Sequence, residues 1–179
     1  MKVFFSHGQE SGPQGSKIRH LAALAVALGN RTESLDYTGI GDPDARADLL
    51  VSRLREERED FVLVGSSMGG YVSLAAAESQ VPRGLFLLAP ALYLEGYRRQ
   101  SFQPRCPAIE IVHGWSDRSI PPDNSIKFAK QADCTLHLIS GDHRLLDSLP
   151  AVSALFKAFI LALMGDTTIP RSKPKPGGG

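Results

Sequence analysis

Two short apolar runs without a polar interruption constrain the fold of this sequence more than any other feature. The runs are Phe61–Val64 and Leu85–Leu88. A strand with one face in solvent alternates apolar and polar residues, so uninterrupted runs indicate strands that are buried on both faces. Such strands occur almost only in parallel sheets with helices on both sides. The sequence therefore predicts an α/β protein.

The rest of the chain fits this class, because strand patterns alternate with helical patterns. Apolar residues three or four positions apart predict helices at Ser16–Leu28, Asp44–Glu59, Met68–Ser79, Asn124–Ala132 and Leu149–Met164. Strands are expected at Lys2–Phe5, Glu33–Tyr37, Phe61–Val64, Leu85–Leu88, Ile109–His113 and Thr135–Ile139. Crossover connections between such strands place the helices on both faces of the sheet. We expect a three-layer α/β/α sandwich with a six-stranded, mostly parallel sheet.

Composition and charge narrow the classes of partner. The chain has 179 residues, the length of one domain, and its 42% hydrophobic and 22% charged residues are typical of globular proteins. Lys and Arg number 20 against 19 Asp and Glu, so the formal charge of +1 creates no field that would attract nucleic acid or anionic lipid. We expect a small-molecule substrate, no nucleic-acid partner and no membrane span. Oligomeric state is left open.

The cysteines indicate the cellular compartment, and the composition near the chain ends indicates where the domain begins and ends. Cys106 and Cys134 fit no zinc spacing and are expected to be free thiols, as in a cytoplasmic protein. The apolar run at the start is too short for a signal peptide. We expect one domain over residues 1–165, followed by a flexible tail over residues 166–179 that is rich in Pro, Lys and Gly.

The segment Gly65-Ser66-Ser67-Met68-Gly69 fits the pattern G-x-S-x-G between an expected strand and an expected helix. In such a turn the serine takes a strained backbone conformation that exposes its hydroxyl, and the glycines leave room for neighbouring elements. Ser66 cannot be the central serine, because Val64 and Met68 would then occupy the glycine positions. The pattern predicts Ser67 as a nucleophile. The alternatives are an ordinary glycine-rich turn and a phosphate-binding turn.

A serine nucleophile needs a base to accept its proton. Five histidines are available: His7, His20, His113, His137 and His143. His143 lies after the last expected strand and before the last helix, where the carboxyl edge of the sheet opens above Ser67. We predict His143 as the base; the alternative is a loop histidine that stabilises a turn.

The base in turn needs a carboxylate that fixes its tautomer and stabilises its charged form. Asp117 follows the strand that ends at His113 and lies on the same side of the sheet as the predicted nucleophile. Asp142 would have to fold back on its neighbour, Asp36 belongs to an earlier strand end, and Asp123 is expected to cap the next helix. We predict Asp117 as the acid, against the alternative of a capping or surface aspartate.

Acyl transfer also needs donors for the developing oxyanion. The Met68 N–H follows the nucleophile and begins a helix, so it is the first predicted donor. The second is expected from the loop after the first strand, at the Gln9 N–H, with Gly8 as the rival. His7 is expected to brace that loop and not to act in catalysis.

The segment from Ala89 to Pro107 is long for a connection but too short for a lid domain. Aromatic residues in loops at the carboxyl edge of a parallel sheet tend to meet ligands. Tyr93 and Tyr97 are therefore predicted to bind substrate; the alternative is that they pack on the sheet as core.

These motifs together resemble the α/β-hydrolase superfamily, in particular its small serine hydrolases without a lid. The resemblance runs from Val3 to about Phe159 and is carried by His7-Gly8, Gly65-x-Ser67-x-Gly69-Gly70, His113-Gly114-x-x-Asp117-x-x-Ile120-Pro121 and Gly141-Asp142-His143-Arg144. The order serine, aspartate, histidine also matches that superfamily. Two features depart from its pattern, namely the missing leading antiparallel strands and the missing cap domain.

The resemblance implies a hydrolase of carboxylic esters or thioesters that works through an acyl-enzyme without a metal or organic cofactor. Two alternatives remain open at this stage. An amidase or peptidase would use the same triad, and a non-catalytic binding protein could keep the fold without the chemistry.

Overall fold

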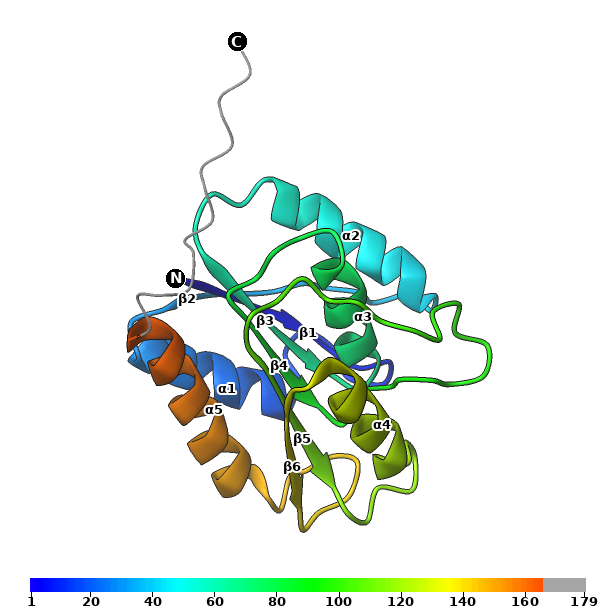
Figure 1. The fold of residues 1–179 in the computed structure, drawn as a ribbon. Helices are drawn as coiled ribbons and strands as arrows, with labels where there is room; N and C mark the ends of the chain where they lie inside the picture. The colour runs from blue at the N-terminus through cyan, green and yellow to red at the C-terminus, as the bar shows by residue number, and fades with distance from the viewer. Residues whose placement is uncertain (166–179) are drawn as a thin grey trace.

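The computed structural model describes residues 1–165, so the tail expected over residues 166–179 lies outside the described part of the chain. Its centre is a six-stranded sheet in the order β2-β1-β3-β4-β5-β6, and every neighbouring pair is parallel (Figure 1). The strands are β1 (Lys2–Ser6), β2 (Arg31–Ser34), β3 (Phe61–Ser66), β4 (Gly84–Leu88), β5 (Ile109–Gly114) and β6 (Thr135–Ile139). The predicted α/β class and parallel sheet are confirmed.

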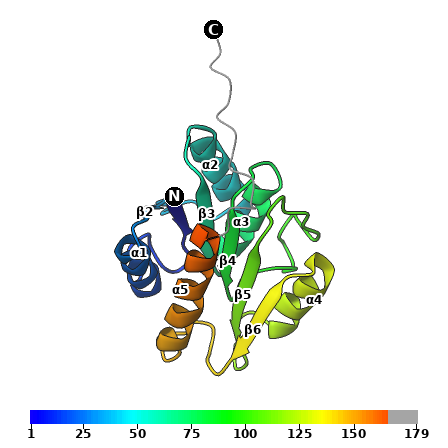
Figure 2. The ribbon, with the colours of Figure 1, turned by 60° about the vertical axis from the view of Figure 1, so that its left-hand side comes forward.

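Helices cover both faces of the sheet, as Figures 1 and 2 show from two directions. On one face lie α1 (Ser16–Ala27) and α5 (Leu149–Gly165), and on the other lie α2 (Pro43–Arg55), α3 (Met68–Ala77) and α4 (Pro122–Ala132). No helix in the described part of the chain has the length and apolar character needed to cross a lipid bilayer. The three expected layers are present.

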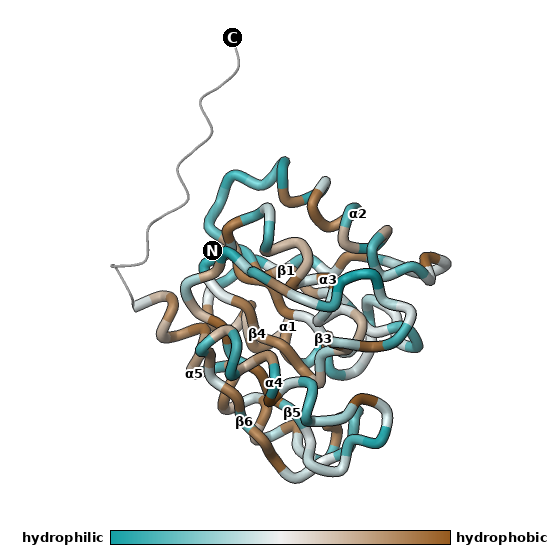
Figure 3. Tube along the Cα trace, turned by 45° about the vertical axis from the view of Figure 1, so that its right-hand side comes forward, coloured by the Kyte–Doolittle hydropathy of each residue, from teal (hydrophilic) through white to brown (hydrophobic). Residues whose placement is uncertain are grey.

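Two hydrophobic cores lie on opposite sides of the sheet, because successive side chains of a strand point to opposite faces. In β3, Leu63 joins the core beneath α2, α3 and α4, whereas Val62 and Val64 join the core beneath α1 and α5. Figure 3 shows brown, hydrophobic chain running through the strands in the middle of the molecule. The apolar runs are therefore buried on both faces, as the sequence predicts.

Two local expectations are wrong. The second strand was expected at Glu33–Tyr37 but is Arg31–Ser34, because this polar edge segment pairs with β1 while the apolar Tyr37 is buried in the connection beyond it. Asp123 does not cap α4: the helix begins at Pro122, and Asp123 lies in its first turn without a side-chain capping bond.

The strand order reverses direction between β1 and β3, since the chain adds β2 on one side of β1 and β3 to β6 on the other. Loops that leave neighbouring strands in opposite directions open a crevice at the carboxyl ends of those strands, where ligands of open α/β sheets bind. The loop after β1 and the turn after β3 flank this crevice.

Candidate active site

Ser67 occupies the turn between β3 and α3 with φ 56° and ψ −121°. A positive φ is unusual for a residue with a side chain and is maintained only by the surrounding structure. The flanking glycines are required there: a Cβ at Gly65 would lie 2.3 Å from the Gly69 carbonyl oxygen, and one at Gly69 would lie 1.9 Å from the Ser6 carbonyl oxygen. The turn is thus packed between β1 and its own helix, and no larger residue fits at either glycine.

A hydrogen-bonded relay runs from Ser67 through His143 to Asp117. The Ser67 Oγ lies 3.0 Å from His143 Nε2, and His143 Nδ1 lies 2.7 Å from Asp117 Oδ2. His143 comes from the loop between β6 and α5, and Asp117 comes from the loop between β5 and α4. Loops that follow three different strands therefore bring the three predicted residues together.

Asp117 is held as a carboxylate although its side chain is fully buried. Burial raises the pKa of Asp117, but the Ile120 N–H, the bonded His143 ring and the Ser119 N–H outweigh that effect and leave the pKa below its usual value. The two backbone N–H groups donate to Oδ1 at 2.8 and 2.9 Å. The other oxygen remains directed at His143, so the carboxylate can orient that ring and stabilise its charged form.

His113 also contacts Asp117, and sequence reasoning did not assign it this place. Its Nε2 lies 3.0 Å from Asp117 Oδ2 and 3.1 Å from the Ile120 carbonyl oxygen, and its Nδ1 lies 2.7 Å from Ser125 Oγ. Because a carbonyl oxygen only accepts, Nε2 carries the proton and Nδ1 accepts from the Ser125 hydroxyl. Burial lowers the pKa of His113, which favours the neutral ring. The only sequence signal was a histidine before a glycine at a strand end, which His7 shares.

The loop after β1 approaches the nucleophile closely. A Cβ at Gly8 would lie 3.2 Å from the Ser67 Cβ, and both Gln9 and Met68 line the same cleft as Ser67. Met68 is the first residue of α3, where an N–H has no acceptor within the helix. Both residues that carry the predicted oxyanion donors therefore line the cleft that contains Ser67.

His7 braces this loop, as the sequence predicts. Its Nδ1 lies 2.7 Å from the Gly8 carbonyl oxygen, and its Nε2 accepts from the Tyr37 N–H at 3.1 Å. Arg46 of α2 reaches the same segment and donates to the His7 and Gly8 carbonyl oxygens at 3.4 and 3.3 Å. Burial lowers the pKa of His7. The ring is neutral and both of its nitrogens are occupied.

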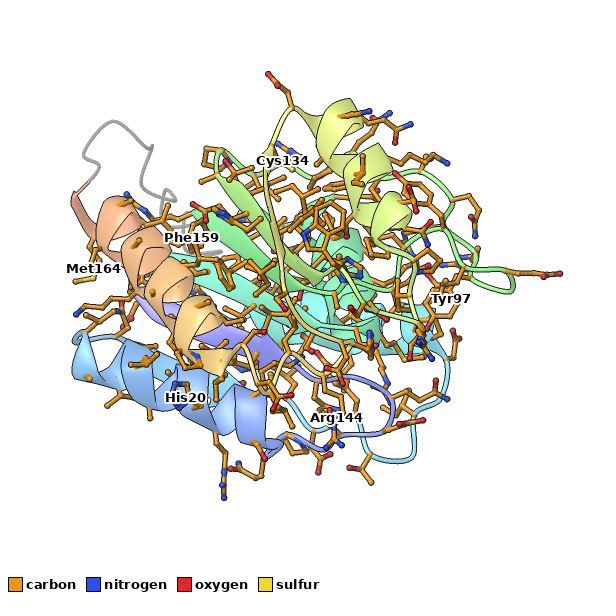
Figure 4. The ribbon with its side chains drawn as sticks, turned by 90° about the horizontal axis from the view of Figure 1, so that it is seen from below. His20, Tyr97, Cys134, Arg144, Phe159 and Met164 are labelled. Carbon is orange, nitrogen blue, oxygen red and sulfur yellow. The ribbon has the colours of Figure 1, made fainter. Side chains whose placement is uncertain are left out.

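A cleft of about 500 Å³ is lined by Ser67 and His143 of the relay. Its walls come from the first turn of α1 and from the loops after β1, β3, β4, β5 and β6, with these side chains among the lining: Lys17, Ile18, Leu94, Tyr97, Ile120, Arg144 and Leu146. Figure 4 shows Arg144 and Tyr97 toward the carboxyl ends of the strands, at the opposite end of the molecule from Met164 of α5. The cleft is lined by both apolar and charged groups.

The two predicted substrate tyrosines lie in different places. Tyr97 lines the cleft. Tyr93 is not among the cleft residues, because its hydroxyl donates to Gln131 at 2.7 Å and its ring lies 4.0 Å from the Lys127 ammonium, both on α4. The prediction for Tyr93 thus finds no support in its position.

The 89–107 segment forms no helix and is fastened to the body of the protein. The Arg99 guanidinium pairs with the Asp44 carboxylate, and the Arg99 N–H donates to the Tyr71 hydroxyl at 3.1 Å. Tyr71 in turn donates to Asp44 at 3.0 Å. These bonds tie the segment to α2 and α3, so it forms a fixed wall and contains no cap domain.

Neither a metal cluster nor a disulfide occurs in the described part of the chain. Among residues 1–165, no group of three or more His, Cys, Asp or Glu side chains is arranged to hold a metal ion. Cys106 and Cys134 are free thiols, as expected. Burial raises the pKa of Cys106 to about 12 and that of Cys134 to about 11.

A parallel sheet with a serine in a positive-φ turn, facing a histidine and an aspartate from later loops, is the arrangement of the α/β-hydrolase class. Comparison with known families agrees with this class. The model of an alpha/beta hydrolase family matches residues 3–172, and the chain belongs to that family. A comparison with curated proteins found no significant match.

Solved structures with similar folds include three from different organisms. An alpha/beta superfamily protein from Xanthomonas campestris pv. campestris is 30% identical with a TM-score of 0.82, over 90% of this chain and 98% of the other. Est1E from Butyrivibrio proteoclasticus is 22% identical with a TM-score of 0.78, over 92% and 88%. Alpha/beta hydrolase domain-containing protein 10 from mouse is 22% identical with a TM-score of 0.71, over 91% and 89%.

Proposed function

We propose that this chain hydrolyses carboxylic esters or thioesters through a covalent acyl-enzyme. One observation carries the proposal: the continuous relay from Ser67 to His143 at 3.0 Å and from His143 to Asp117 at 2.7 Å. A structural role for these residues would not require a serine in a strained turn beside a cleft, with a histidine oriented by a buried carboxylate.

The reaction proceeds in two halves. As the Ser67 Oγ attacks the substrate carbonyl carbon, its proton moves to His143 Nε2, and Asp117 stabilises the imidazolium. The intermediate collapses when the bond to the leaving alcohol or thiol breaks and that group takes the proton from His143. Water then gives a proton to His143 and attacks the acyl carbon to form a second tetrahedral intermediate. The bond from that carbon to the Ser67 Oγ breaks, the Oγ takes the proton back from His143, and the carboxylic acid is released.

The Met68 and Gln9 N–H groups are assigned to the oxyanion of both tetrahedral intermediates. Removing one such donor costs about 3 to 4 kcal/mol of transition-state stabilisation in a serine hydrolase. The position of Met68 at the start of α3 adds the positive end of the helix. Tyr97 is assigned to the wall that contacts substrate, because it lines the cleft beside Ser67.

Labelling with a fluorophosphonate, together with turnover of p-nitrophenyl acetate, tests this function. We expect the wild type to be labelled and active, and Ser67→Ala to lose labelling and nearly all turnover. Ser101→Ala, an exposed serine outside the cleft, is the control and should retain both. An unlabelled, inactive wild type would favour a binding protein. Labelling with cleavage of anilides but not esters would favour an amidase.

A further inference from the structure

We propose that the cleft selects esters or thioesters that carry an anionic group, such as a carboxylate, in the acyl part or the leaving group, and that Lys17 and Arg144 bind that group. This inference rests on the proposed function and adds a substrate class to it. Two cationic side chains from different segments, α1 and the loop that carries the base, line the cleft that contains Ser67.

Lys17 is a partly buried cation without a direct partner. Among residues 1–165, its ammonium makes no hydrogen bond or ion pair. Burial lowers the pKa of Lys17 to about 8, although the charges of Asp142 and Asp117 oppose that shift; the nearby Arg144 lowers it further. An ammonium that has lost part of its hydration and gained no ion pair is a favourable place for a substrate anion.

The nearby carboxylates already have partners. Asp142 Oδ1 accepts the N–H groups of Arg144 and Leu145 at 2.9 and 3.1 Å, and Asp117 is fixed by the catalytic relay. Neither carboxylate is within ion-pairing distance of Lys17. The Lys17 charge is thus moderated by these groups but is not neutralised through contact.

Arg144 follows the catalytic base directly in sequence, so an anion bound to it belongs to a molecule that also reaches Ser67. Its side chain is exposed, and in the described part of the chain its guanidinium forms no ion pair or hydrogen bond. Figure 4 shows this side chain on the loop after β6. A planar guanidinium can bind both oxygens of a carboxylate, whereas an ammonium acts as a compact charge.

Two other features of the lining modify the positive charge that Lys17 and Arg144 give to the cleft. The first turn of α1, at Gly15 and Ser16, faces the cleft, and Gly15 has no side chain to cap the helix N–H groups, so the helix end adds partial positive charge. Glu10 also lines the cleft but is exposed, and water and salt screen an exposed charge more than a partly buried one. The balance therefore favours anions.

The central experiment compares kcat/KM for the p-nitrophenyl half-ester of glutarate with that for p-nitrophenyl valerate, which has the same number of acyl carbons and no charge. A second pair places the carboxylate on the leaving group, with 3-carboxy-4-nitrophenyl valerate against 4-nitrophenyl valerate. We expect at least one charged ester to be preferred by about tenfold or more, since a hydrogen bond to a charged group contributes on this scale. The preference should shrink as salt is raised.

Variants assign the preference to the two cations. Lys17→Met and Arg144→Gln should each reduce the preference about tenfold while turnover of the neutral ester changes little, and Lys17→Arg should retain most of it. Arg19→Gln removes the same charge from an exposed position of α1 outside the cleft and should leave the preference unchanged. Equal rates for charged and neutral esters, or a preference that survives both Lys17→Met and Arg144→Gln, would overturn the inference.

A binding measurement separates this inference from the proposed function. Calorimetry with glutarate should detect binding to Ser67→Ala, weakened by the further change Lys17→Met. Loss of all ester turnover with glutarate binding retained would refute the proposed function and leave the anion site supported. Turnover of neutral esters without charge preference and without glutarate binding would refute the anion site alone. Absence of turnover and binding would refute both.

Discussion

His7 and His113 share a His-Gly pair and a place at the carboxyl end of a parallel strand, yet they hold different parts of the site. Each is buried, and each precedes a glycine at the carboxyl end of a parallel strand. His7 must carry its proton on Nδ1, which faces the Gly8 carbonyl oxygen, whereas His113 must carry it on Nε2, which faces Asp117 and the Ile120 carbonyl oxygen. The two rings are opposite tautomers.

The difference shows that hydrogen-bond partners, and not the His-Gly motif, determine what each histidine does. His7 fixes main chain in the loop beside the nucleophile, and His113 fixes the carboxylate of the relay. Both nitrogens of both rings have partners within the protein. Only His143 directs a nitrogen at the hydroxyl of Ser67. The comparison therefore supports the proposed role of His143 as the base and leaves positioning roles to the other two.

The largest expected effect tests the distinction between the proposed base and the two positioning histidines. His143→Gln removes the proton acceptor of Ser67 and should lower kcat by about 10⁶-fold, the loss measured for the equivalent change in a serine protease. His7→Gln and His113→Gln should each retain far more activity, because neither ring touches the nucleophile. Ester hydrolysis by the three variants checks this order. A loss at His113 equal to that at His143 would end the distinction between base and positioning residue.

The next effect concerns Asp117, the proposed acid, which both His113 and His143 contact. Asp117→Asn presents an amide NH₂ to His143 Nδ1 or to His113 Nε2, which favours the wrong tautomer of the base and should lower kcat by about 10⁴-fold. Asp142→Asn keeps an amide oxygen for the Arg144 and Leu145 N–H groups and should cost less than about tenfold. Steady-state kinetics of both variants decides the assignment, and a larger loss at Asp142 would reverse it.

The sequence predicted the sheet and the three relay residues because these depend on local patterns. The apolar runs of β3 and β4 reflect burial on both faces, and the Ser67 turn reflects glycines without which the chain could not pass β1. The roles of His113 and Tyr93 depend on partners that come from elsewhere in the chain, namely Ser125 for the former and Gln131 for the latter. No local pattern encodes such partners.

The second strand shows the same limit of prediction from local sequence patterns. Arg31–Ser34 is polar because it lies at the sheet edge, where Glu33 pairs with Lys2 and Arg53. The apolar residues that follow it are buried by the fold of the connection, and Tyr37 lies against His7. Periodicity places a strand where apolar residues are dense, so it selected the connection and not the edge strand.

A moderate effect is expected when His113 no longer donates to Asp117. His113→Gln leaves the buried carboxylate with one partner fewer or with a misplaced one, which should lower kcat by about 10- to 100-fold. Because the base itself is intact, KM should change little. Ser125→Ala removes only the hydroxyl that orients the His113 ring and should give a smaller loss. An unchanged kcat in His113→Gln would show that Asp117 needs no help from this ring.

The smallest expected effect concerns the pH dependence of stability, and it has the same direction for His7 and His113. Burial lowers the pKa of both rings below the ordinary value of 6.5, so between the folded and unfolded pKa values the unfolded chain binds more protons. The free energy of unfolding should therefore be highest above about pH 6.5. It should fall as the pH drops below that value, by at most about 1.4 kcal/mol per pH unit for each ring. Urea unfolding of the wild type, His7→Gln and His113→Gln at pH 7.5 and 5.5 measures this slope.

Each variant is less stable at pH 7.5 because it loses buried hydrogen bonds, but each should lose less stability on acidification than the wild type. A variant with the full wild-type slope would show that its histidine does not stay neutral in the folded protein, and the tautomer assigned to that ring would then be wrong.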